Sequence, residues 1–157
     1  MKRKVYVETT VISYLASRLS RDLIIAANQQ ITQEWWALRR NDFDLFVSQL
    51  VISEASAGDN EAGQRRMEIL TAIPLLALNE EAVQLAETLI NKKTIPEKAV
   101  EDALHIAVAA ANGMDYLITW NFKHIANATM RGQIEYICRL SGYEPPIICS
   151  PQELMEK

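Results

Sequence analysis

Short apolar runs typical of β-strands alternate with longer helical patterns along most of this chain. We interpret as strands the runs at about residues 4–7, 43–48, 114–119 and 147–149, with a further short one at 75–78. Apolar residues recur at helical spacing over about 9–15, 21–40, 61–72, 80–92, 96–112 and 130–142. This alternation predicts an α/β fold, an α/β/α sandwich in which helices cover both faces of a central, mostly parallel sheet.

The length and charge of the chain narrow what it can do. Its 157 residues suit one domain, and because no linker or internal repeat divides them, we expect a single domain over residues 1–157. Sixteen Lys and Arg stand against twenty Asp and Glu, a net charge of −4. An acidic total argues against broad electrostatic gripping of nucleic acid, although a metal ion can reverse the charge locally.

The sequence favours a cytoplasmic protein. No stretch approaches the roughly 20 apolar residues of a membrane span, so we expect no contact with a membrane. Glu8 interrupts the apolar run after the basic start, which favours a strand over a secretion signal. Cys138 and Cys149 have neither a CxxC spacing nor a paired His, and are typical of small core residues in a reducing compartment.

Three polar side chains stand at or beyond the ends of predicted strands. Glu8 closes the first strand, Glu54 follows the second on a short helix, and Asn121 follows the strand at 114–119. Ligands bind at the carboxyl ends of strands in an open α/β sheet, so we expect these side chains to converge. Oxygen ligands from distant parts of a chain suit a hard divalent cation, Mg²⁺ or Mn²⁺.

A fourth candidate, Asp102, lies on the most apolar helix of the chain. We predict that this helix begins at a capping box, Thr94–Glu97, and ends at Asn112. Its polar residues Lys98, Asp102, His105 and Asn112 form one narrow stripe. A buried carboxylate is costly unless it is paired or binds a metal, which favours Asp102 as a ligand. The alternative is that the stripe faces water.

The other candidates also have plainer interpretations. Glu8 would cap the following helix, although Thr9 or Thr10 would be the better cap. Glu54 would lie on a solvated helix face, and Asn121 in a turn. Each position alone is weak, and the hypothesis of a metal site rests on their combination.

Four segments, in this order, carry a resemblance to a known family: Val5–Val11, Ser48–Glu54, Asp102–Ala107 and Leu117–Phe122. They resemble the PIN-domain family, in particular the single-domain VapC-type toxins of toxin–antitoxin pairs. The resemblance implies a PIN-like α/β/α sandwich and a ribonuclease that depends on Mg²⁺ or Mn²⁺. We therefore expect an RNA substrate, a small antitoxin partner and a homodimer.

Carried over by position, the resemblance makes Glu8, Glu54 and Asp102 the acidic metal site and catalytic residues. Asn121 takes the place of a fourth acid in the same site. The family's first acid is usually Asp, where this chain has the longer Glu8, and its fourth is also Asp. Three negative charges instead of four favour one firmly held ion over two. The alternative function is a weakened or inactive PIN scaffold that binds RNA or protein.

Residues around these four are expected to support them. Thr10 and Thr119 are the neighbouring hydroxyls, and His105 lies on the same helix face as Asp102, either as a proton relay or as a structural histidine. Three basic residues are candidates for holding RNA phosphates, or else belong to a solvated loop: Lys123, His124 and Arg131. Glu101 is excluded because it lies about 100° round the helix from Asp102.

The segment from Ile24 to Leu38 carries more large apolar side chains than one helix face needs. Trp35 and Trp36 are adjacent and therefore about 100° apart on a helix. We expect one of them near the surface, in a groove for an antitoxin helix or a second subunit. The alternative is that both pack in the core.

Overall fold

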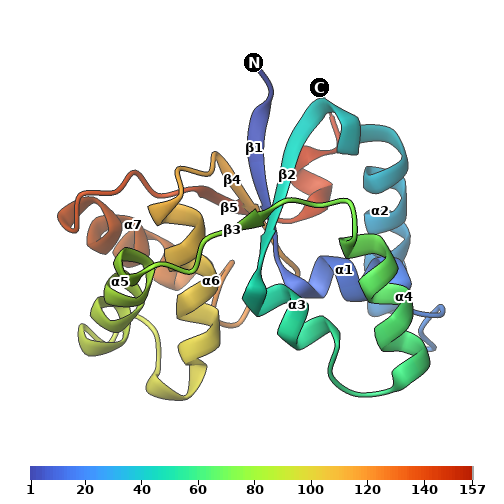
Figure 1. The fold of residues 1–157 in the computed structure, drawn as a ribbon, viewed down its shortest axis with the longest axis horizontal. Helices are drawn as coiled ribbons and strands as arrows, with labels where there is room; N and C mark the ends of the chain where they lie inside the picture. The colour runs from blue at the N-terminus through green and yellow to red at the C-terminus, as the bar shows by residue number, and fades with distance from the viewer. Residues whose placement is uncertain (157) are drawn as a thin grey trace.

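Figure 1 shows the computed structural model, which describes residues 1–156. Across that range five strands form one sheet in the order β3-β2-β1-β4-β5, and each neighbouring pair is parallel. The strands are β1 (Arg3–Val7), β2 (Phe43–Ser48), β3 (Leu75–Leu76), β4 (Tyr116–Ile118) and β5 (Ile147–Cys149). The predicted α/β class and parallel sheet are confirmed.

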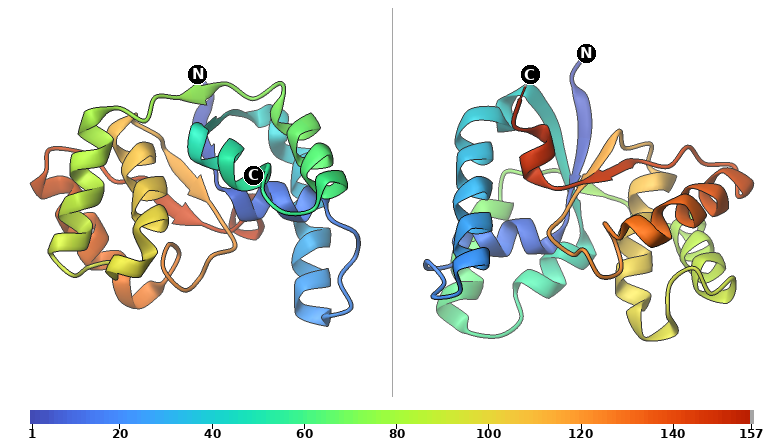
Figure 2. Two further views of the ribbon diagram at one scale, coloured as in Figure 1. Left: turned by 60° about the horizontal axis from the view of Figure 1, so that its bottom comes forward. Right: turned by 180° about the vertical axis from the view of Figure 1, so that it is seen from behind.

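Helices cover both faces of the sheet. α1 to α4 gather on one side and α5 to α7 on the other, as both views of Figure 2 also show. Their bounds are α1 (Thr9–Ala16), α2 (Leu23–Arg39), α3 (Gln49–Ala55), α4 (Asn60–Leu70), α5 (Glu80–Asn91), α6 (Val100–Ala111) and α7 (Ala128–Leu140). The short 3-10 helices, in chain order, are η1 (Arg40–Asp42), η2 (Glu97–Ala99) and η3 (Pro151–Leu154).

The strand order reverses between β1 and β4, which are neighbours in the sheet. The chain leaves β1 through α1 and α2 on one side, and leaves β4 towards α7 on the other. The two connections therefore diverge at the carboxyl ends of these strands. Such a switch point opens a crevice, where ligands bind in parallel α/β sheets.

The predicted start of α6 is wrong. Thr94 forms no capping box: its hydroxyl is buried and has no hydrogen-bond partner among residues 1–156. The backbone N–H groups of Thr94 and Ile95 donate instead to the carbonyl of Leu89, which closes the end of α5. The chain then makes the turn η2 before α6 begins at Val100. Thr94 therefore ends one helix and does not begin the next.

The core confirms that β1 and α6 are buried elements. Val5, Tyr6 and Val7 are fully inaccessible, and most of α6 from Ala103 to Ala110 is buried. The polar residues of α6 do not form one stripe as predicted, because the side-chain amide of Asn112 donates to the carbonyl of Ala77, away from Asp102. Within residues 1–156 no helix is long and apolar enough to cross a membrane.

The two adjacent tryptophans of α2 differ, as expected. Trp35 is fully buried and stacks on Phe43, with the ring centroids 6.0 Å apart. Trp36 is half-buried, and the guanidinium carbon of Arg40 lies over its ring, 5.0 Å from the ring centroid. Only Trp36 is therefore accessible to a partner.

Candidate metal centre

The predicted site residues come from four elements that meet at the β1–β4 switch point. Glu8 directly follows β1, and Glu54 lies on α3, which begins immediately after β2. Asp102 is in the first turn of α6, and Asn121 lies in the loop after β4. The convergence expected from the sequence therefore occurs, but the side chains fall into two groups.

Glu8 is almost completely buried and fully engaged by hydrogen bonds. Its Oε1 accepts hydrogen bonds from the hydroxyls of Thr10 and Thr119, at 2.6 and 2.5 Å. Its Oε2 accepts one from the backbone N–H of Thr10, at 3.2 Å. Glu8 is thus the N-cap of α1, and the expectation that Thr9 or Thr10 would cap it is wrong. Glu8 therefore both caps the helix and holds a carboxylate at the switch point of the sheet.

Glu54 completes the first group. Its Oε1 accepts hydrogen bonds from the Thr9 hydroxyl at 2.5 Å and from His105 Nε2 at 2.7 Å. Partial burial alone would raise the pKa of Glu54, but the hydrogen bonds and charge of His105, with the bond from Thr9, hold that pKa below its usual value. Glu54 is therefore ionised at neutral pH, as a metal ligand must be.

Glu101 also belongs near this group. The pKa of its exposed carboxyl is raised, and the main cause is the neighbouring carboxylate of Glu54. An angle of about 100° from Asp102 on α6 does not separate Glu101 from α3, which supplies Glu54. The exclusion of Glu101 from the ligands stays a prediction.

His105 lies in a buried hydrogen-bond chain that the sequence analysis missed. Its Nδ1 is 2.7 Å from the Tyr6 hydroxyl, and that hydroxyl is 2.7 Å from Ser48 Oγ. In the sequence, Tyr6 lies within an apolar run that predicts a strand. A tyrosine in the middle of a buried strand needs a hydrogen-bond partner, and that signal was available.

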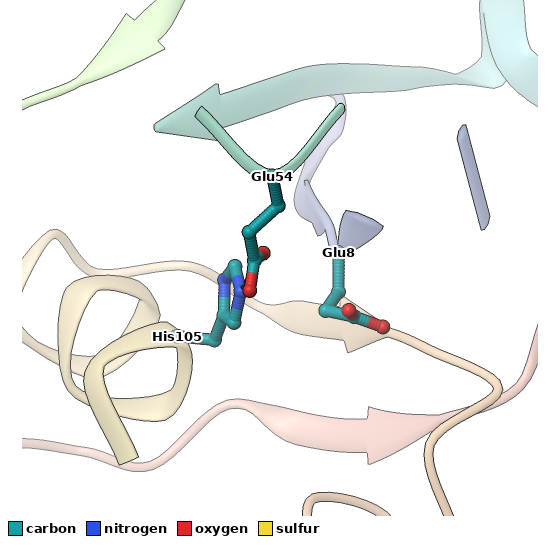
Figure 3. Close-up of side chains that lie close together, drawn as sticks. All are labelled: Glu8, Glu54 and His105. Atoms are coloured by element: carbon teal, nitrogen blue, oxygen red, sulfur yellow. Dashed lines mark hydrogen bonds and ion pairs between the residues drawn. The ribbon is translucent and has the colours of Figure 1, made fainter. Parts of the chain in front are cut away.

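The geometry decides whether His105 can bind a metal. One potential ligand atom from each of Glu8, Glu54 and His105 lies within 4.8 Å of the other two (Figure 3). The Glu54 carboxylate can only accept a hydrogen bond, so His105 Nε2 must carry the proton. A protonated Nε2 has no lone pair for a metal. We therefore assign His105 as a donor that orients Glu54.

The electrostatics agree with that assignment. Burial lowers the pKa of His105, but its hydrogen bond to Glu54 and the charges of nearby carboxylates outweigh burial, so the pKa rises above its ordinary value. Burial also raises the pKa of Tyr6, which keeps its hydroxyl protonated. The Tyr6 hydroxyl and the His105 Nε2 therefore keep their protons and remain hydrogen-bond donors within the chain of hydrogen bonds from Ser48 to Glu54.

Asp102 belongs to a second group, beside the first. Its Oδ1 accepts a hydrogen bond from the Asn121 side-chain amide at 3.0 Å, and its Oδ2 is 3.1 Å from His124 Nδ1. The Asn121 backbone N–H donates to the Thr119 hydroxyl at 2.9 Å, and this hydroxyl donates to Glu8. Thr119 therefore connects the two groups.

The three residues considered for RNA contacts lie in different surroundings. Lys123 is exposed, whereas His124 is directed to Asp102 and belongs to the carboxylate site. Arg131 is half-buried, and its Nε is buried without a partner among residues 1–156. Phe122, next to Asn121, is 50% exposed, an accessible aromatic ring that the sequence analysis did not select.

The charges of the site favour a cation. Across residues 1–156, neither Lys nor Arg forms an ion pair with Glu8, Glu54 or Asp102; the ion pairs of Glu54 and Asp102 are with histidines. Gathering carboxylates away from water is unfavourable unless positive charge offsets them. Their oxygens are hard ligands, and this donor set fits Mg²⁺ or Mn²⁺.

Comparison with known proteins places the chain in a family. The family model of the PIN domain matches residues 5–127, a range that includes Glu8, Glu54, Asp102 and Asn121. The chain therefore belongs to the PIN domain family. Arg131, α7 and β5 lie beyond the matched range.

The fold also resembles a solved structure. A chain in the crystal structure of VapBC2 from Rickettsia felis, bound to a DNA fragment from their promoter, superposes with a TM-score of 0.54. The sequences are 16% identical, over 76% of this chain and 89% of that one. This likeness concerns the fold. No curated protein matches the sequence significantly.

The buried hydrogen-bond chain makes a prediction about stability. Tyr6→Phe removes the hydroxyl that lies between Ser48 and His105, and leaves buried polar groups without a partner. We expect the free energy of unfolding in urea to fall by about 1–3 kcal/mol. Tyr136→Phe is the control, because Tyr136 is exposed. An equal loss in both variants would show that the chain contributes nothing to stability.

Proposed function

We propose that this protein is an endoribonuclease that depends on Mg²⁺ or Mn²⁺ and serves as the toxin of a toxin–antitoxin pair. One observation carries the proposal: carboxylates from β1, α3 and α6 gather at the switch point of the sheet without a Lys or Arg partner. Membership of the PIN domain family supports a nuclease. The metal, the substrate and the partner are proposals.

Glu8 and Glu54 are the residues best placed to hold the ion. Both are fixed before any ion binds, Glu8 by Thr10 and Thr119, and Glu54 by Thr9 and His105. Fixed ligands reduce the ordering that binding requires. When bound, a divalent cation stabilises negative charge on phosphoryl oxygens and lowers the pKa of water.

Asp102 completes the charge of the site from the first turn of α6. Its two oxygens are oriented by Asn121 and His124. Asn121 is itself held, because its Oδ1 accepts hydrogen bonds from the backbone N–H groups of Lys123 and His124. The neutral side-chain amide of Asn121 therefore acts as a hydrogen-bond donor to Asp102. We expect three charges and one firmly held ion.

The surroundings of the site suit a single-stranded RNA. We propose that exposed Lys123 and half-buried Arg131 contact phosphates, because basic side chains bind phosphates whatever the base sequence. The exposed ring of Phe122 offers a surface on which a base can stack. Trp120 is committed to packing, since it stacks on Tyr14 and its indole N–H donates to Thr32.

An antitoxin partner is supported by an apolar surface at the start of α2. Leu23 and Ile24 are 85% and 74% exposed, and Leu19 nearby is 74% exposed. Accessible clusters of large apolar side chains are typical of protein interfaces. The solved neighbour is described as a VapBC assembly, which agrees with a partner of the antitoxin type. We propose that a small antitoxin covers this surface in the cell, and that the toxin is a cytoplasmic homodimer.

The first test of the proposal concerns Asp102. Asp102→Asn keeps the size of the side chain and removes its charge, so we expect cleavage of a mixed RNA pool with Mn²⁺ to fall by roughly 10²–10³-fold or more, as when one group that stabilises a transition state is lost. Glu87→Gln, an equal loss of charge on the exposed face of α5, should cleave like the wild type.

Two outcomes of that experiment would contradict the proposal. Cleavage by Asp102→Asn at the wild-type rate would remove Asp102 from the site. A wild-type protein that binds the RNA pool without cutting it at any Mn²⁺ concentration would favour the alternative, a PIN scaffold that acts as a binding module.

The second test concerns Asn121 and is independent of activity. Asn121→Asp replaces the amide that donates to Asp102 with a carboxylate, so two like charges face each other when no ion is present. We expect a lower melting temperature in EDTA than for the wild type, and a larger rise on addition of Mn²⁺. Asn91→Asp, on the exposed end of α5, is the control. An equal rise in variant and wild type would place residue 121 outside the reach of the ion.

A further inference from the structure

A groove lies on the opposite half of β2 from the carboxylates. Its volume is about 700 Å³, and it is bordered by the ends of α2 and α4, the first residues of β2 and the chain that enters β3. Trp36, Phe46 and Ile73 give it an apolar lining. None of its residues belongs to the candidate metal centre, so it needs a separate explanation.

The groove follows an unpaired stretch of strand. β2 is six residues long, but β3 pairs only with its last two, Val47 and Ser48. On its other side β2 pairs with β1 from Phe43 to Phe46. The outer edge of Phe43–Phe46 therefore has no neighbouring strand within residues 1–156. In Figure 1 the chain from α4 crosses β2 to form β3, which pairs with the carboxyl end of β2.

The backbone groups on this edge can be assigned. In a parallel pair, alternate residues direct their N–H and C=O groups to the same neighbour. The N–H of Val47 points outward, to the carbonyl of Pro74. The backbone groups of Leu45 and Phe43 must therefore point outward too. The N–H of Phe43 already donates to the carbonyl of Arg40, so the groups left without a neighbouring strand within residues 1–156 are the N–H and C=O of Leu45 and the C=O of Phe43.

The lining shows that this edge is accessible. All four consecutive residues from Phe43 to Phe46 border the groove, although neighbouring side chains in a strand point to opposite faces. A cavity can touch all four only if it runs along the edge of the strand. Its walls thus offer main-chain donors and acceptors together with apolar surface.

The charges at the rim indicate which occupant fits. Asp44 and Glu68 are exposed carboxylates that border the groove, and neither forms an ion pair with residues 1–156. The one cation among the lining residues, Arg40, lies over the ring of Trp36. Two free carboxylates repel phosphate and attract a basic side chain. A helix would leave the edge of β2 unpaired, because its own backbone groups are already bonded.

We propose that this groove binds an extended peptide with basic side chains, which adds to the sheet as a strand along Phe43–Phe46. The peptide backbone pairs with the outward N–H and C=O groups of Leu45 and with the C=O of Phe43. Its apolar side chains lie against Trp36 and Ile73, and its basic side chains face Asp44 and Glu68. Main-chain bonds give affinity in such strand addition, and the side-chain contacts give selectivity.

The probe for this site is a short fluorescent peptide of alternating valine and lysine, followed by anisotropy. We expect it to bind, and a valine–glutamate peptide to bind far more weakly. The double variant Asp44→Asn/Glu68→Gln should lower the affinity for the lysine peptide by about threefold for each carboxylate removed, the effect of one surface ion pair. Glu81→Gln/Glu87→Gln removes two charges from exposed positions on α5 and should bind like the wild type.

Amide hydrogen exchange separates strand addition from other modes of binding. In the free protein the N–H of Leu45 should exchange rapidly, and saturation with the lysine peptide should slow its exchange at least tenfold. Binding without this protection would overturn the proposal, as would the absence of binding. Slow exchange at Leu45 in the free protein, together with a dimer in sedimentation, would assign the groove to a second copy of the chain and would also overturn it.

Discussion

The chain of hydrogen bonds from Ser48 through Tyr6 and His105 to Glu54 joins β2, β1, α6 and α3 in the interior of the protein. Each bond links residues more than 40 positions apart in the sequence. A buried polar network stabilises one arrangement of a core when all its members are satisfied. Here it fixes the relative position of the two elements that carry Glu8 and Glu54. The geometry of the carboxylate site therefore depends on a part of the core that contacts no ligand.

The negative charge of the carboxylates is offset only by histidines among residues 1–156. Glu8 is almost completely buried, and its partners are hydroxyls and one backbone N–H, which orient its charge without neutralising it. Asp102 and Glu54 are partly exposed and have only histidines as ionic partners. A site of this kind gains stability when a cation binds, so folding and metal binding should be coupled. The same charges would repel a phosphodiester if no cation were present.

Much of the fold could be predicted from the sequence, because apolar periodicity reports burial directly. β1, β2 and the buried helix α6 lie close to where the pattern placed them, and Glu8, Glu54 and Asp102 reach the edge of the sheet expected from strand ends. The missed features depend on contacts between distant segments. A tyrosine in a buried strand indicates that a partner is needed, but the partners of Tyr6 come from β2 and α6 and cannot be identified from its own segment. Thr94 was misinterpreted because its backbone closes α5, and the role of His124 is visible only once its loop lies against α6.

The most direct test of the metal site is anomalous diffraction from a crystal of the protein soaked in Mn²⁺. The account predicts one strong manganese peak in contact with the carboxylates of Glu8 and Glu54, while His105 Nε2 remains hydrogen-bonded to Glu54. A manganese ion bound by His105 Nε2 would contradict the assignment of that histidine as a donor. The absence of any peak between Glu8 and Glu54 at saturating Mn²⁺ would contradict the metal site itself.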